Sequence, residues 1–153
     1  MMATEKTARA IWEGDLMSGS GRVSTGSGVL SDEGVNWSAR AEDADGVSPE
    51  ELIAAAHATC VSMALSHTLA EQGNAPTRLE TEATTTFDKT DAGFRLTTIK
   101  LAIDGEVEGI DGVAFLEAAE AARDNCPVSK ALEGNVEISV EATLSSPSPS
   151  RSA

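Results

Sequence analysis

The sequence predicts an α+β fold in which mostly antiparallel strands surround one long central helix that carries a cysteine. The helix is expected at residues 49–72, which include most of the longest stretch without turn-forming residues. Segments of alternating apolar and polar residues on both sides of this stretch predict the strands. A second, shorter helix precedes the second cysteine.

Both ends of the central helix are marked by residues with a known capping role. Ser48 suits the N-cap, Pro49 suits the first helical position, and Glu51 completes a capping box. Gly73, with Pro76 shortly after it, is typical of a helix C-terminus. The sequence therefore predicts one unbroken helix between these signals.

Apolar side chains recur along this helix at steps of three and four, so we expect them to share one buried face. This row consists of Ile53, Ala56, Cys60, Met63, Ala64 and His67. A cysteine on such a face is most often a small packed hydrophobe, which is the plain interpretation of Cys60. His57 and His67 are expected to pack or to line a pocket.

Three short strands are expected before the helix, at residues 7–13, 20–30 and 34–41. On the third strand Arg40 would face away from Trp37, and an exposed strand-edge charge is its plain interpretation. Few large apolar residues occur in these strands, so their sheet needs cover from elsewhere. A second copy of the chain would supply it, which predicts a homodimer.

After the helix, the pattern alternates again between strands and helices. Strands are expected at 79–87, 94–103 and 136–140, a hairpin turn at Asp91-Ala92-Gly93, a bulge or twist near Thr97-Thr98, and helices at 113–125 and 128–132. Pro127 places Cys126 at a helix terminus where the chain turns. Residues 145–153 are low in complexity and expected to be disordered, which leaves a single domain at 1–144.

Charge and composition exclude several classes of function. A net charge of −14 argues against nucleic acid and anionic membranes as partners, since both are polyanions. No transmembrane span is expected, and Met1–Arg9 lacks the apolar run of a signal peptide. These features predict a cytoplasmic protein, in which both cysteines are reduced at rest. No metal and no cofactor are predicted.

Two alternatives for the cysteine chemistry start from His57 and Cys60. Their spacing on one helix would suit the start of a zinc site, but no further ligand cluster accompanies them. A cysteine–histidine hydrolase is the other alternative, but the sequence contains no oxyanion-hole motif.

Several motifs together resemble the OsmC/Ohr family of organic hydroperoxide reductases over roughly residues 8–144. They are Trp12-Glu13-Gly14-Asp15, the segment 21–30, Arg40, the segment Pro49–Cys60, Asp91-Ala92-Gly93-Phe94 and Cys126-Pro127-Val128-Ser129. The OsmC branch fits better than the Ohr branch. The segment that supplies the arginine in Ohr proteins is here Met17-Ser18-Gly19, whereas Arg40 stands where the OsmC branch has its arginine.

The resemblance implies an OsmC-like intertwined homodimer and a role for four residues. Cys60 would be the peroxidatic cysteine, Cys126 the resolving cysteine, Arg40 the activating cation and Glu50 its carboxylate. Only a thiolate attacks a peroxide, so a thiol in an apolar pocket needs such a cation. The resulting sulfenic acid would be trapped as a disulfide. The resemblance further implies that a dihydrolipoyl dithiol on a lipoylated protein reduces this disulfide.

Two functions therefore stay open at the level of sequence. The first is a thiol peroxidase for organic hydroperoxides, in which the apolar row beside Cys60 favours bulky peroxides. The second is a dimeric binding protein that holds a small apolar ligand without turnover. Glu50 and Cys60 are ten residues apart, about 15 Å along one helix. If Glu50 orients the arginine that activates Cys60, as the resemblance implies, the Glu50 of each site is expected to come from the partner chain.

Overall fold

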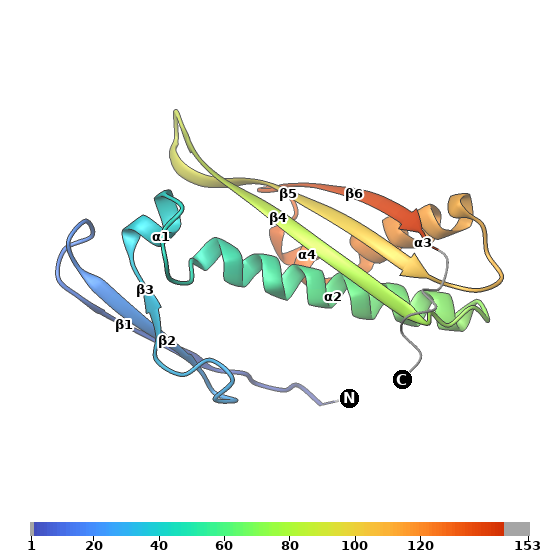
Figure 1. The fold of residues 1–153 in the computed structure, drawn as a ribbon, viewed down its shortest axis with the longest axis horizontal. Helices are drawn as coiled ribbons and strands as arrows, with labels where there is room; N and C mark the ends of the chain where they lie inside the picture. The colour runs from blue at the N-terminus through green and yellow to red at the C-terminus, as the bar shows by residue number, and fades with distance from the viewer. Residues whose placement is uncertain (1, 146–153) are drawn as a thin grey trace. The chain divides into compact units, whose positions relative to one another are not determined.

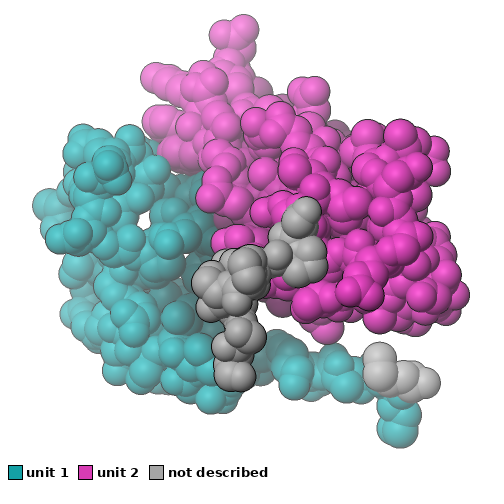
Figure 2. Space-filling view, turned by 45° about the vertical axis from the view of Figure 1, so that its right-hand side comes forward, with its two compact units in different colours: residues 1–52 teal, residues 53–153 magenta. Residues whose placement is uncertain are grey.

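The computed structural model describes residues 2–145 (Figure 1). These residues belong to two compact units, Met1–Leu52 and Ile53–Ala153, which are described in turn (Figure 2). Of the predicted disordered tail, residues 146–153 lie outside the described residues. Ser145 is held by hydrogen bonds to Asp104 and to the carbonyl of Gly105. The assignment of residues 1–144 to a single domain stays a prediction.

The first unit contains a small antiparallel sheet in the order β1-β2-β3. Its strands are β1 (Ala8–Glu13), β2 (Ser20–Thr25) and β3 (Glu33–Val35). The first two lie where the sequence placed them, although β2 ends at Thr25, before a turn in which Gly28 adopts a positive φ of 78°. All of β1 is exposed in the single chain, including Ile11 and Trp12. The sheet is as thinly covered as its composition predicted.

The predicted third strand at residues 34–41 is wrong over most of its length. After β3 the chain forms a short helix, α1 (Trp37–Ala41), with Arg40 in its last turn. The side chain of Asn36 accepts a hydrogen bond from the Ala39 amide at 2.7 Å, which caps the helix. In so short a segment the apolar and polar residues alternate by chance, so the pattern imitated a strand.

Helix α2 (Pro49–Glu71) begins and ends as its capping residues predicted. The hydroxyl of Ser48 accepts a hydrogen bond from the Glu51 amide at 3.1 Å. At the other end Gly73 has a φ of 85°, and the Asn74 amide donates to the Leu69 carbonyl at 2.8 Å. This arrangement satisfies backbone groups that a helix C-terminus leaves unpaired.

The buried face of α2 differs from the predicted one. The core-facing row is His57, Val61, Leu65 and Leu69, all fully buried. Met63 is 69% exposed, and His67 is exposed and pairs with Glu71 at 3.4 Å. The helix is apolar on nearly all sides, so spacing alone did not distinguish the row that faces the core. Cys60 lies beside the core row and is half-buried.

The second unit is built on a three-stranded sheet in the order β4-β5-β6. Its strands are β4 (Arg78–Thr90), β5 (Gly93–Glu106) and β6 (Glu137–Leu144). The predicted hairpin is confirmed, with Thr90 opposite Gly93, and so is the bulge, because the register shifts at Thr86 and makes Thr97 the extra residue. Strand β6 pairs with β5 in parallel. Parallel pairing requires a crossover, and two helices supply it.

Those helices are α3 (Gly112–Asn125) and α4 (Pro127–Leu132), and with α2 they cover one face of the sheet (Figure 1). The core between the layers is formed by alternate residues of β5 and by the inner faces of α2 and α3. Its largest members are Phe115, Leu65, Leu69, Ile99 and Leu101. The outer face of the sheet is polar, with exposed Glu80 and Glu82 on β4 and Glu141 on β6.

By length and composition alone, α2 is long and apolar enough to cross a membrane. Core helices of soluble proteins also meet this criterion. In this chain one row of α2 packs into the core of the second unit. The expectation that the chain has no membrane span therefore depends on this packing and not on the composition of the helix.

Candidate active site

The two cysteines lie against each other on different helices of the second unit. Cys60 is on α2, and Cys126 lies where α3 ends and α4 begins. Pro127 cannot continue α3, so Cys126 takes an extended conformation (φ −62°, ψ 125°). Its amide still donates to the Ala122 carbonyl of α3 at 2.9 Å, and its carbonyl accepts from the Lys130 amide of α4 at 3.0 Å. The thiol of Cys126 is thereby fixed at the junction and is fully buried.

The surroundings of Cys60 within the second unit disfavour its thiolate. Burial raises the pKa of the Cys60 thiol most, and the hydrogen bond with Cys126 raises it further. The backbone amide of Val128 acts in the opposite direction, and charge repulsion from Cys126 adds a smaller upward effect on this pKa. Both cysteines are free thiols. A reaction that needs the thiolate therefore needs a further cation.

Arg40 and Glu50 form an ion pair within the first unit. Arg40 Nε donates to Glu50 Oε1 at 3.0 Å, and a terminal nitrogen of Arg40 lies 2.9 Å from the same oxygen. Glu50 is 7% exposed and stands in the first turn of α2, whereas the Arg40 side chain is 37% exposed. The Glu50 carboxylate thus accepts from two nitrogens of the guanidinium and fixes its orientation.

The predicted site residues thus form two pairs, one in each unit: Arg40 with Glu50, and Cys60 with Cys126. Each pair has a distinct chemical capability. A guanidinium held by a carboxylate is a preorganised anion-binding group. Two adjacent thiols can convert into a disulfide.

A third buried pair was missed by the sequence reasoning. His57 Nε2 lies 2.7 Å from the hydroxyl of Ser129, and both residues are buried. His57 was expected to pack or line a pocket, and Ser129 appeared only as part of a motif. A signal was present, because His57 precedes Cys60 by three residues and Ser129 follows Cys126 by three. Burial lowers the pKa of His57, which favours the neutral form of its ring.

Neither alternative for the cysteine chemistry gains support from the geometry. Among residues 2–145, no three His, Cys, Asp or Glu side chains are grouped as a metal site. His57 Nε2 contacts the hydroxyl of Ser129, at 2.7 Å.

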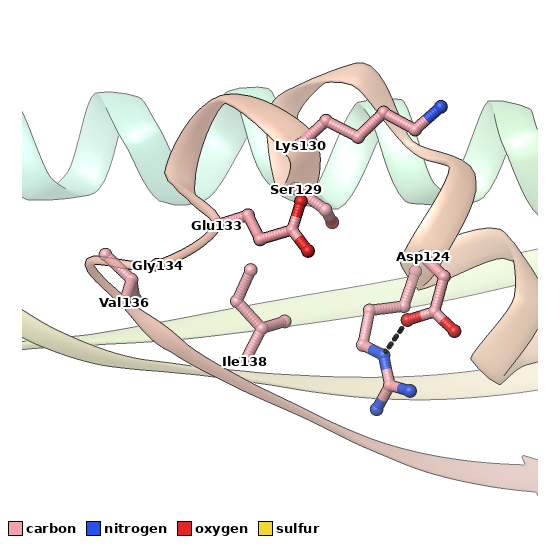
Figure 3. A pocket seen from close by; sticks show the side chains of 8 residues that line it. Asp124, Ser129, Lys130, Glu133, Gly134, Val136 and Ile138 are labelled. Carbon is pink, nitrogen blue, oxygen red and sulfur yellow. Dashed lines mark hydrogen bonds and ion pairs between the residues drawn. The ribbon is translucent and has the colours of Figure 1, made fainter.

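A surface depression of about 380 Å³ lies beside α4 (Figure 3). Its lining is largely charged and consists of Arg123, Asp124, Ser129, Lys130, Glu133, Gly134, Val136 and Ile138. Arg123 and Asp124 are paired across 3.0 Å, and Lys130 points away from the hollow. Neither cysteine lines it, so this depression is not where an apolar molecule would meet Cys60.

The chain belongs to the family of OsmC-like proteins, whose model matches residues 42–141. Peroxiredoxin OsmC of Escherichia coli is 44% identical over 137 residues, which cover 90% of this chain and 96% of that protein. Organic hydroperoxide resistance protein OhrB of Bacillus subtilis is 32% identical over 122 residues, 79% of this chain and 88% of the relative.

Solved structures have the same fold. The crystal structure of OhrB of Bacillus subtilis superposes with a TM-score of 0.72 at 29% identity, covering 90% of this chain and 98% of that one. An organic hydroperoxide resistance protein from Elizabethkingia anophelis gives a TM-score of 0.71 at 26% identity, covering 95% and 100%. The predicted family and fold class are therefore confirmed.

Replacing Cys126 by alanine is expected to lower the pKa of Cys60. The substitution removes the hydrogen bond and the charge repulsion that raise this pKa, while burial continues to raise it. The midpoint of the pH dependence of Cys60 alkylation should therefore move to lower pH, measured with iodoacetamide and site-resolved mass spectrometry. Cys126→Ser retains a hydrogen-bonding hydroxyl and should fall between the two. Equal midpoints in the wild type and Cys126→Ala would show that Cys126 does not raise the pKa of Cys60.

Proposed function

We propose that this protein is a thiol peroxidase that reduces organic hydroperoxides to alcohols. The observation that carries the proposal is the contact between the half-buried Cys60 and the buried Cys126. A pocket that only binds an apolar ligand has no use for a second thiol at this point, so the binding protein is the weaker candidate. The names of the relatives, a peroxiredoxin and organic hydroperoxide resistance proteins, support the same reaction class.

The reaction follows from the chemistry of the pair. The Cys60 thiolate attacks the outer peroxide oxygen, so an S–O bond forms, the O–O bond breaks, and the leaving alkoxide takes a proton to become the alcohol. Cys126 then attacks the sulfur of the Cys60 sulfenic acid, which forms the disulfide and releases water. Ala64, one helical turn after Cys60 on α2, is partly buried against the same core, and an apolar side chain on this face favours an organic peroxide.

Activation of Cys60 is assigned to Arg40 in this proposal. The raised pKa of Cys60 demands a cation, and the Arg40 guanidinium is already oriented by Glu50. The planar guanidinium fork can hold both a carboxylate and a thiolate, which a lysine ammonium does not do with the same geometry.

The disulfide must be reduced before another turnover, and a dithiol does this by thiol–disulfide exchange. The family resemblance favours a dihydrolipoyl group on a lipoylated protein as this reductant. We place the protein in the cytoplasm, where thiols are kept reduced.

The proposed functional unit is a homodimer with shared sites. Glu50 and Cys60 lie on one unbroken helix, α2, about 15 Å apart along its axis, which supports the delivery of Arg40 and Glu50 from the partner chain. The exposed strand β1 and the exposed Met63 of α2 are apolar surfaces that a second copy would cover.

The reduced protein is expected to consume cumene hydroperoxide in the presence of dihydrolipoamide, because Cys60 and Cys126 complete a redox cycle. Cys60→Ser should fall to the uncatalysed rate. Without the dithiol, mass spectrometry should find a disulfide between Cys60 and Cys126 of one chain. A product cross-linked only between chains, or unchanged turnover in Cys60→Ser, would refute the proposal. Binding of the peroxide without turnover would favour the binding protein.

Arg40→Lys is expected to lower kcat/KM by about tenfold or more, which corresponds to at least roughly 1.4 kcal/mol of transition-state stabilisation. A lysine keeps the charge but does not bind Glu50 and a thiolate with the same planar geometry. Arg22→Lys is the matched control, because Arg22 is an exposed arginine of the same unit that pairs with Glu13 at 3.6 Å. Near-normal turnover in Arg40→Lys would remove Arg40 from the mechanism.

Mixing inactive Cys60→Ser chains with inactive Glu50→Gln chains is expected to restore activity. In each heterodimer one site would combine an intact Cys60 with an intact Glu50 from the other chain. Random exchange would give roughly one quarter of the wild-type activity. A mixture of Cys60→Ser with Cys60→Ala serves as the control and should stay inactive. If heterodimers form without recovery, Glu50 acts within its own chain or not at all.

A further inference from the structure

His57 is a buried polar side chain for which the proposed reaction has no use. It is fully buried in the core row of α2, and its Nδ1 atom has no hydrogen-bond partner among the described residues. A buried nitrogen without a partner costs free energy, and a leucine at this position would fill the space without that cost. The contact that offsets this cost is the one between His57 Nε2 and the Ser129 hydroxyl, at 2.7 Å.

This contact runs parallel to the contact between the two thiols. His57 is one helical turn before Cys60 on α2, and Ser129 is one turn after Cys126 at the start of α4. The two segments therefore meet at two successive levels, His57 with Ser129 and Cys60 with Cys126. A hydrogen bond that holds His57 and Ser129 together therefore also limits the distance between the Cys60 and Cys126 sulfur atoms.

Apart from the backbone amide of Val128, which donates to the Cys60 sulfur, helix α4 has few other means of holding its position among the described residues. It has only six residues, well below the length at which a helix is stable alone. No side-chain hydrogen bond caps its N-terminus at Cys126. Its apolar anchors, Val128 and Leu132, are only partly buried against the core. A directional hydrogen bond from α2 therefore adds a constraint that apolar packing alone does not supply.

We propose that His57 and Ser129 are positioning residues that hold Cys126 within reach of Cys60, and thereby direct oxidised Cys60 toward the disulfide. This inference rests on the proposed peroxidase function. The Cys60 sulfenic acid has two fates. Attack by Cys126 gives the disulfide and water, whereas a second hydroperoxide oxidises the sulfenic acid to sulfinic acid and releases a second alcohol. The contact between His57 and Ser129 favours disulfide formation because it keeps the Cys126 thiol close to the Cys60 sulfur.

The test measures this partition in the full-length protein. Reduced wild type, Ser129→Ala and His57→Leu are treated with a series of cumene hydroperoxide concentrations, and mass spectrometry quantifies disulfide and sulfinic acid at Cys60. The ratio of disulfide to sulfinic acid should fall about fivefold in both variants, as expected for the loss of one buried hydrogen bond. His57→Gln retains a polar group near the Nε2 position and should recover part of this ratio. The initial rate of peroxide consumption should not fall, because loosening the contact with Cys126 does not raise the pKa of Cys60.

Ser62→Ala separates positioning from a general loss of stability. The Ser62 hydroxyl also lies on α2 and contacts the Thr81 hydroxyl of β4 at 2.7 Å, on a different side of the helix. Its loss should lower thermal stability and leave the partition at the wild-type value. An equal shift in Ser62→Ala, or a wild-type ratio in Ser129→Ala, would overturn the proposal. Ser129→Ala decides alone if His57→Leu does not fold.

A second arm does not depend on peroxidase activity. Diamide adds to one thiol, and the second thiol then attacks that sulfur, forming the disulfide and releasing the hydrazine. At saturating diamide the rate of disulfide formation therefore reports how often Cys126 meets Cys60. Ser129→Ala should slow this step about fivefold relative to the wild type and to Ser62→Ala. If Ser129→Ala is oxidised by diamide more slowly than the wild type, and the wild type consumes no hydroperoxide, the peroxidase would be refuted and the positioning pair supported. Equal diamide rates in all variants would refute the pair.

Discussion

The break of the helix at Cys126-Pro127 is the constraint on which the arrangement of the second unit depends. Proline has no amide hydrogen and fixes its own φ, so α3 ends there and a new helix starts in a different direction. Cys126 sits at that corner with both backbone groups in use, one toward each helix. The thiol is therefore presented by rigid backbone and not by a mobile loop. Ser129 is carried to His57 by the same change in direction.

Burial of Cys60 disfavours its thiolate, and we assign the compensating positive charge to Arg40. The position that gives Cys60 apolar neighbours also raises its pKa, which works against the thiolate. Arg40 and Glu50 carry the compensating charge on the first unit, and the proposed dimer brings it to the thiol of a partner chain. Substrate preference and nucleophile activation are thereby assigned to different parts of the chain.

The sequence predicted those parts of the fold that depend on local chemistry. The capped ends of α2, the hairpin before Gly93 and the bulge at Thr97 all follow from residues that lie next to each other in the chain. Prediction from the sequence failed where one pattern of residues was compatible with more than one structure. Residues 37–41 alternated like a strand although Asn36 caps a helix there, and the core-facing row of α2 is set by the sheet that packs on it.

Four residues of the candidate site could be predicted from the sequence, whereas the contact between His57 and Ser129 could not. Cys60, Cys126, Arg40 and Glu50 were identified through the family resemblance, because nothing in local spacing links residues so far apart. The pairing of Ser129 with His57 needed the three-dimensional structure, since it joins segments that only the crossover from β5 to β6 brings together. A serine in a short helix has no distinctive local pattern.

The polar outer face of the sheet also restricts how copies of this chain associate. Glu80, Glu82 and Glu141 lie exposed on it, in a chain with a net charge of −14. Arg78 pairs with Glu80 at 3.2 Å, and Lys100 pairs with Glu141 at 3.1 Å. Two such faces repel each other at low ionic strength, and salt weakens this repulsion. Stacking of one sheet on another is therefore disfavoured, so the acidic face acts against filaments and higher aggregates while leaving the apolar surfaces elsewhere free to associate.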